Sequence, residues 1–228
     1  MFSLRQSFCK LVRNSITNII IQPILSISRM TSSSSSGMKT KIAVIQLNST
    51  EDKLSNFNIA KRLVEDASKD GARVAFLPEC FDMICPSRQQ TIENGEPILG
   101  DTVNKYRELA KTNKIWLSLG GFHEKDANSQ DNRLFNAHII LNNEGDIVSI
   151  YRKIHLFNLD IPGTRLIESE FSQSGNTVIK PVPSPCGNIG QGICYDLRFP
   201  EFAISLAKGG ADIISVFCLF VIYRRDEF

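Results

Sequence analysis

From about residue 41 onward, the apolar and polar positions follow two different patterns along the chain. Short apolar runs bounded by turn residues are typical of strands, and the clearest run covers residues 74–77. Apolar residues at helical spacing cover 54–67, and Gly71 follows as a stop signal. Residues 120–121, both glycine, are expected to close a strand. The pattern predicts strands at 41–47, 74–77, 115–119 and 211–216, and helices at 54–67, 106–110 and 200–208.

Two further pairs of apolar segments are separated by turn residues. Residues 136–141 and 147–151 flank an Asn-Asn-Glu-Gly sequence, which favours a β-hairpin. Residues 178–182 and 189–193 bracket a Pro-containing loop in the same way. Alternating strands and helices, mixed with hairpins, predict an α/β domain in which helices pack on sheets.

The composition is ordinary for a soluble globular protein, with 228 residues, 42% apolar and 22% charged. A net charge of +2 gives no reason to expect a nucleic-acid partner. The apolar patch at 16–27 is interrupted by polar residues and is too short to span a bilayer, so no membrane partner is expected.

The first 40 residues differ from the rest in charge. They contain Arg, Lys and Ser, and no acidic residue precedes Glu51, which resembles a mitochondrial transit peptide. Initiation at Met30, just before the Ser32–Ser36 linker, would leave a cytosolic form. We therefore expect residues 1–40 to be a disordered targeting segment and linker, and the protein to be both mitochondrial and cytoplasmic.

Six cysteines, at positions 9, 80, 85, 186, 194 and 218, do not form a recognisable disulfide framework. In a mitochondrial or cytosolic protein we expect them to remain reduced. Cys80 and Cys85 have no matching Cys/His pair at zinc spacing, so no metal site is predicted. His123 and His155 are expected to be structural.

Three residues that are far apart in the sequence offer complementary chemistry. Cys194 follows the apolar run 189–193 and precedes a helix starting at Pro200, a position where a thiol can be presented at the edge of a sheet. Glu79 can act as a general base toward that thiol, and the Lys153 ammonium can stabilise an oxyanion. Together they describe acyl transfer through a thioester, which needs no metal or other cofactor.

The segments around these residues resemble the three signature motifs of the nitrilase superfamily. They are Phe-Leu-Pro-Glu at 76–79, Tyr-Arg-Lys at 151–153 and Ile-Cys-Tyr-Asp-Leu-Arg-Phe-Pro-Glu at 193–201. The resemblance implies an αββα sandwich fold, here incomplete at the C-terminus. It also implies that Cys194 is the nucleophile, Glu79 the base and Lys153 the oxyanion-stabilising cation.

The same resemblance implies further site residues. The N–H of Tyr195 would complete the oxyanion hole, Arg198 could bind a substrate carboxylate, and Glu168 falls near the family's second structural glutamate; we group all three with the substrate-binding residues. Segments 116–124 and 198–201 look like the branch that hydrolyses deaminated glutathione. Residues 87–121 look like invertebrate members that are fused to a dinucleoside polyphosphate hydrolase. The expected partners are a small-molecule amide substrate and, as in the family, further copies of the chain.

The expected nitrilase domain covers residues 41–216, and 217–228 departs from the family pattern as a divergent tail. The family continues with a further helix and strands, so we expect the strand at 211–216 to lose sheet partners. Two alternatives to deaminated-glutathione hydrolysis remain. One is ω-amidase activity on α-ketoglutaramate, and the other is a non-catalytic truncated isoform or a fragment of a nitrilase–dinucleoside polyphosphate hydrolase fusion. Expressed alone, the polypeptide is expected to be insoluble or unfolded, and inactive.

Overall fold

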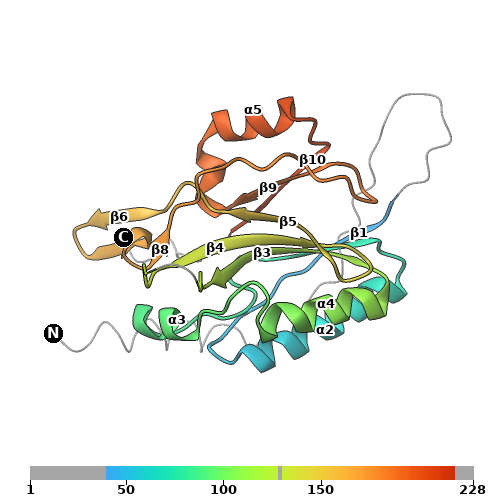
Figure 1. Ribbon diagram of the computed structural model, residues 1–228, viewed down its shortest axis with the longest axis horizontal. Helices are drawn as coiled ribbons and strands as arrows, with labels where there is room; N and C mark the ends of the chain where they lie inside the picture. Colours follow the sequence, from blue (N-terminus) through green and yellow to red (C-terminus); the bar gives the residue numbers. More distant parts are fainter. Residues whose placement is uncertain (1–39, 128–129, 219–228) are drawn as a thin grey trace, which may run out of the picture.

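The computed structural model describes residues 40–127 and 130–218. Most of the predicted targeting segment, residues 1–39, and the tail beyond Cys218 lie outside the described residues. The described part forms four layers, in the order helices, sheet, sheet, helix (Figure 1). This arrangement confirms the predicted αββα sandwich.

The larger sheet has six strands, with the path β1–β2–β3–β4–β5 and β8 paired to β4. The strands are β1 (Ile42–Val44), β2 (Val74–Leu77), β3 (Trp116–Glu124), β4 (Leu134–Leu141), β5 (Ile147–Arg152) and β8 (Ser172–Gln173). β1, β2 and β3 are parallel, whereas β3, β4 and β5 are successively antiparallel. β5 therefore runs in the same direction as β2, and the C-terminal ends of both strands lie at one edge of the sheet.

Two helices, α2 (Lys53–Lys69) and α4 (Asp101–Asn113), cover one face of this sheet (Figure 1). All four residues of β2 are buried, because the sheet is covered on both faces. Ala75 and Leu77 belong to the core under the helices, whereas Val74 and Phe76 belong to the core between the sheets. The uninterrupted apolar run at 74–77 thus reflects a strand with no solvent-facing side.

The second sheet pairs β9 (Ile189–Ile193) in parallel with β10 (Ile213–Phe217), and helix α5 (Pro200–Lys208) packs outside it. We expected the strand at 211–216 to lose its sheet partners. This expectation is wrong for one edge of the strand, since all five residues of β10 pair with β9. Phe217, which we assigned to the divergent tail, is the last residue of β10. Its ring packs against Phe76 and His138 in the core between the sheets.

Several elements differ from the sequence-based expectation. β3 runs through the glycines at 120–121, because β4 pairs with it on both sides of a register shift there. Residues 178–182 form no strand and make only a single bridge, from Val182 to Ile189. The unpredicted elements are helix α3 (Arg88–Asn94), the hairpin of β6 (Asn158–Ile161) and β7 (Thr164–Ile167), the short strand β8, and two 3-10 turns, η1 (Glu168–Glu170) and η2 (Cys194–Arg198).

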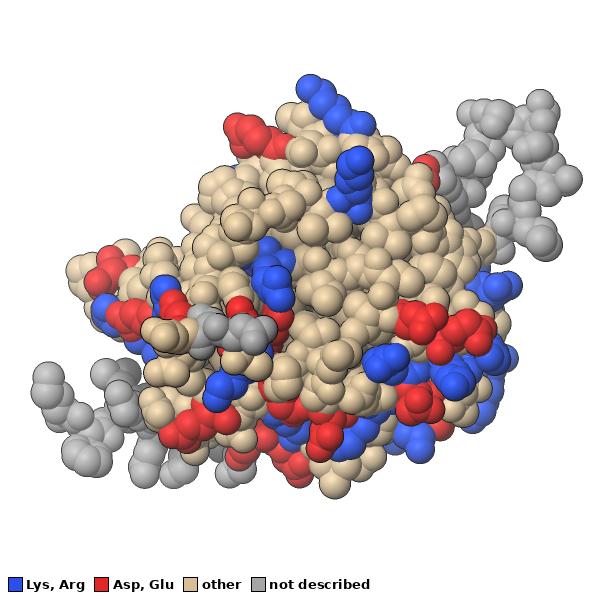
Figure 2. All heavy atoms as spheres, viewed as in Figure 1, with Lys and Arg blue, Asp and Glu red and all other residues tan. Residues whose placement is uncertain are grey.

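Surface charge is mixed in sign. On the face shown in Figure 2, Lys and Arg side chains are interspersed with Asp and Glu over α2 and α4, without forming a patch of one sign. Within residues 40–127 and 130–218, no helix is both long and apolar enough to cross a membrane. The same residues contain no group of three or more His, Cys, Asp or Glu side chains arranged to hold a metal ion.

Candidate active site

Each of the three predicted catalytic residues lies just beyond the C-terminal end of a strand. Glu79 follows β2 by two residues, Lys153 directly follows β5, and Cys194 directly follows β9. β2 and β5 end at the same edge of the larger sheet, and β9 faces that sheet. The topology thus brings together residues that are 41 to 115 positions apart in the chain.

The Lys153 ammonium lies between two carboxylates in the interior. Lys153 is 1% exposed, with its Nζ 3.5 Å from Glu79 Oε1 and 2.9 Å from Glu168 Oε2. Burial disfavours the charge, but the two carboxylates outweigh it and hold the pKa of Lys153 above its ordinary value. The lysine is therefore a fixed cation and not a proton acceptor at neutral pH.

Glu79 is held by neighbouring backbone and by an amide. Asn136, near the start of β4, donates its Nδ2–H to Glu79 Oε1 over 2.9 Å. The Cys80 N–H donates to the Gly121 carbonyl, which fixes the segment after β2 against β3. At Gly121 the backbone φ is +81°, and a Cβ would lie 2.6 Å from Glu79 Cγ, so only glycine fits beside the base.

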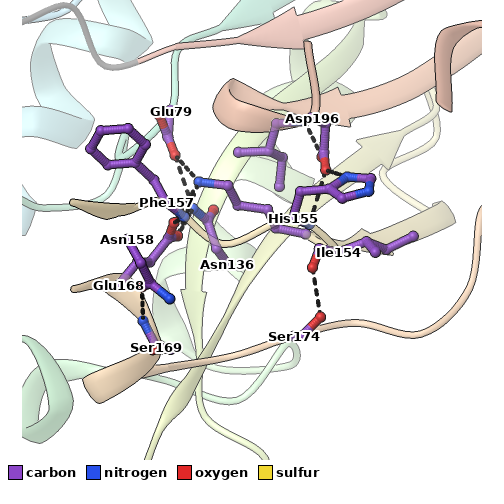
Figure 3. Close-up of polar contacts among 12 residues, drawn as sticks. Glu79, Asn136, Ile154, His155, Phe157, Asn158, Glu168, Ser169, Ser174 and Asp196 are labelled. Carbon is purple, nitrogen blue, oxygen red and sulfur yellow. Dashed lines mark hydrogen bonds and ion pairs between the residues drawn. The ribbon is translucent and has the colours of Figure 1, made fainter. Parts of the chain in front are cut away.

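Glu168 contacts donors with both of its oxygens (Figure 3). Oε1 accepts from Lys153 Nζ at 3.0 Å and from Asn136 Nδ2 at 3.5 Å, and Oε2 accepts from the Phe157 N–H at 2.6 Å. The side chain, which we had grouped with the substrate-binding residues, thus supports Lys153. Asn136 donates to both glutamates and links them.

Cys194 begins the 3-10 turn η2 with a left-handed backbone, at φ +45°. Such a conformation is strained for a residue with a Cβ and is typical of sites that present a side chain for reaction. A hydrogen bond to the Cys218 thiol, burial and the charge of Glu79 raise the pKa of Cys194, whereas Lys153 acts in the opposite direction. The thiol is therefore protonated at neutral pH, and its activation requires a base.

Asp196 joins the lysine segment to the cysteine segment. Its carboxylate is fully buried and accepts from the Ile193 N–H, the Tyr151 hydroxyl and His155, through both the backbone N–H and the ring Nδ1. The His155 ring stacks on Phe199 with centroids 3.7 Å apart. This network fixes the residue two positions after Lys153 to the residue two positions after Cys194 (Figure 3).

The other two predicted residues of the nucleophile segment, Tyr195 and Arg198, lie in the turn η2. The Tyr195 ring packs edge-on against Phe157 and Phe199. Arg198 is exposed, and among the described residues it makes no ion pair. Its positive charge contributes to lowering the pKa of the Cys218 thiol. His123, ion-paired to the buried Asp82, and His155 both have structural partners.

The sequence profile of carbon-nitrogen hydrolases matches residues 41–224. The chain belongs to the carbon-nitrogen hydrolase family. Deaminated glutathione amidase of Mus musculus is 43% identical over 189 residues, which cover 82% of this chain and 58% of that protein. The nitrilase and fragile histidine triad fusion protein NitFhit of Drosophila melanogaster is 42% identical over 205 residues, covering 90% of this chain and 44% of that protein. These matches confirm the resemblance.

The fold agrees with a solved member of the same carbon-nitrogen hydrolase family. The crystal structure of the C. elegans NitFhit protein superposes with a TM-score of 0.73 at 42% sequence identity, covering 79% of this chain and 44% of that chain. The chain spans roughly half the length of the relatives that it matches.

Two polar residues of this carbon-nitrogen hydrolase site were not predicted from the sequence. Asn136 and His138 are the two polar residues of an otherwise apolar strand, and a polar residue in such a position was the available signal. Asp196 lies within the nucleophile motif, but nothing in the sequence indicated that its partners are Tyr151 and His155.

Proposed function

We propose that this chain is an amidase that hydrolyses deaminated glutathione to α-ketoglutarate and cysteinylglycine. The observation that carries the proposal is the buried Lys153 ammonium, held between Glu79 and Glu168 and acting electrostatically on the protonated Cys194 thiol. A base, a fixed cation and a thiol in one site support acyl transfer through a thioester.

The first half-reaction forms the thioester. Glu79 accepts the Cys194 proton as the sulfur attacks the amide carbonyl, and the carbonyl oxygen becomes an oxyanion. The Lys153 ammonium and the Tyr195 N–H stabilise that oxygen. When the intermediate collapses, the C–N bond breaks, and the departing nitrogen takes the proton from Glu79.

The second half-reaction returns the enzyme to its starting state. Glu79, now a carboxylate again, accepts a proton from water while the water oxygen attacks the thioester carbonyl. The C–S bond then breaks, the acid product leaves, and the proton returns to the Cys194 sulfur. Because Lys153 stays charged throughout, the same cation serves both tetrahedral intermediates.

The choice of an α-keto acid amide rests on the relatives and on Arg198. Deaminated glutathione carries carboxylates, and a planar guanidinium binds a carboxylate through two parallel hydrogen bonds. Arg198 is exposed, lies four residues after the nucleophile and makes no ion pair among the described residues. We propose it as the carboxylate contact of the substrate.

The test incubates the purified protein with deaminated glutathione and, separately, with α-ketoglutaramate. We expect α-ketoglutarate and cysteinylglycine from the first substrate, at a higher kcat/KM than α-ketoglutarate and ammonia from the second. Cys194→Ala should abolish both reactions, and the matched variant Cys186→Ala should retain them. Preference for α-ketoglutaramate would favour the ω-amidase alternative. A polypeptide that fails to melt cooperatively, or releases no product from either substrate, would favour the non-catalytic alternative.

The cellular location follows as a separate proposal. We infer from the acid-free start of the chain and from Met30 that mitochondrial and cytosolic forms both exist. Fractionation with sequencing of the mature N-termini should yield two forms, and a single form would refute the proposal.

A further inference from the structure

The parallel strands β9 and β10 lie side by side (Figure 1), and a cysteine directly follows each of them. The register pairs Ile193 with Phe217, so the next residues, Cys194 and Cys218, leave the same end of the two-stranded sheet. Neighbouring strands lie about 4.8 Å apart, and disulfides join residues whose Cα atoms are about 4.4–6.8 Å apart. The backbone therefore brings the two cysteines within disulfide range.

Both cysteines are half-buried, and each thiol shifts the pKa of the other, upward for Cys194 and downward for Cys218. The proposed catalytic cycle uses only Cys194 and leaves Cys218 without a role.

The two thiols differ in acidity. The interaction with Cys194, together with the charges of Lys153 and Arg198, outweighs burial and the charge of Glu79 and lowers the pKa of Cys218 to about 7. The pKa of Cys194 is raised, so Cys218 is the more acidic thiol of the pair. A thiolate is the form that reacts with peroxides, and a second thiol in contact with it can resolve the product.

We propose that Cys194 and Cys218 form a redox-active dithiol, which a hydroperoxide such as hydrogen peroxide converts to an intramolecular disulfide. The Cys218 thiolate attacks one peroxide oxygen, the O–O bond breaks, and the leaving hydroxide takes a proton to become water. The Cys194 sulfur, losing its proton, then attacks Cys218, an S–S bond forms, and the sulfenic hydroxyl departs as a second water. Two thiols are oxidised by two electrons and one peroxide is reduced.

The consequence for activity rests on the proposed function. In the disulfide, Cys194 has no free sulfur to attack a carbonyl, so the amidase is switched off reversibly. The other described cysteines are poor candidates for this chemistry, because burial raises the pKa of Cys80, Cys85 and Cys186.

The test treats the intact protein with equimolar hydrogen peroxide, blocks free thiols and analyses non-reduced peptides by mass spectrometry. We expect a peptide cross-linked through Cys194 and Cys218, absent after reduction with dithiothreitol and absent from Cys218→Ser. The matched variant Cys186→Ser should still give it. A protein that gives no such peptide, while dimedone labels Cys194 or Cys218 as a lasting sulfenic acid, would overturn the proposal.

Activity provides the second readout. Peroxide should inactivate the amidase, dithiothreitol should restore it, and Cys218→Ser should be inactivated about tenfold more slowly because its thiolate is gone. Inactivation of Cys218→Ser at the wild-type rate would contradict the dithiol. If the protein has no amidase activity, the cross-linked peptide still decides the proposal, so the two proposals fail separately.

Discussion

Glu168→Gln tests whether the buried cation depends on its second carboxylate. The substitution keeps the size of the side chain and removes its charge. Every contact of the Glu168 oxygens is a donor, from Lys153, Asn136 or the Phe157 N–H. Whichever way the glutamine amide is turned, its NH₂ group faces a donor, and one hydrogen bond is replaced by repulsion.

The magnitude follows from what remains around Lys153. Breaking a buried ion pair by removing one partner costs about 3–5 kcal/mol, because the other charge stays buried. Glu79 still lies 3.5 Å from the Lys153 Nζ, which places the expected cost near the lower end, at about 3 kcal/mol. For a protein of this size, 1 kcal/mol lowers Tm by about 2–4 °C, so we expect a decrease of roughly 6–12 °C.

Thermal unfolding followed by circular dichroism measures the effect, with Lys153→Met as the partner variant. If the penalty comes from an unpaired charge, the two substitutions should cost less together than the sum of their separate costs, by at least about 1 kcal/mol. A shift in Tm below about 2 °C for Glu168→Gln would refute the reasoning, since it corresponds to less than about 1 kcal/mol. So would strictly additive costs in the double variant.

Three further predictions follow from other parts of the structure. Asp196→Asn removes the charge that fixes His155 to the nucleophile turn. We expect steady-state assays to show a fall in kcat of about 100-fold with little change in KM, and a change confined to KM would contradict this positioning role. Phe217→Ala empties space between the sheets and should cost about 3–5 kcal/mol in denaturant unfolding, whereas a cost under about 1 kcal/mol would show that the sheets do not depend on this ring. Burial disfavours the charge on His123, but Asp82 outweighs it and holds the pKa of His123 well above its ordinary value; its stabilising effect should be full below about pH 6.5 and decline as pH rises through the raised pKa. His123→Gln should flatten that decline in unfolding experiments across the same pH range, and an unchanged slope would count against it.

The elements predicted most accurately are those specified by local sequence. β2 has the predicted bounds because its apolar run is buried on both faces, and α5 has them because Pro200 begins it and a glycine follows its end. Helix α3 was missed since its residues are largely polar, and the β6–β7 hairpin was missed since each of its strands has only four residues. β3 was predicted too short, because its pairing with β4 outweighs the intrinsic weakness of glycine in a strand.

The same distinction applies to the site. Glu79, Lys153 and Cys194 were found because each lies in a short motif next to a strand end. Asn136 and Asp196 were not found, because their roles consist mainly of hydrogen bonds to residues 32 to 57 positions away. Local patterns indicate which residues react, whereas the residues that orient them become visible only when the strands are placed in space.

The placement of these residues shows why the core between the sheets matters for the chemistry. Glu79 and Lys153 belong to the larger sheet and Cys194 to the smaller one, so their separation depends on how the two sheets pack. Phe217 fixes how closely the sheets pack at β3. Its ring lies against Gly120, where a Cβ would lie 1.8 Å from it, so only a glycine fits there. Asp196 fixes the sheets at a second place, because it holds the segment after β5 to the segment after β9. Substitutions at Phe217 should therefore lower kcat as well as stability, even though the ring belongs to the core between the sheets.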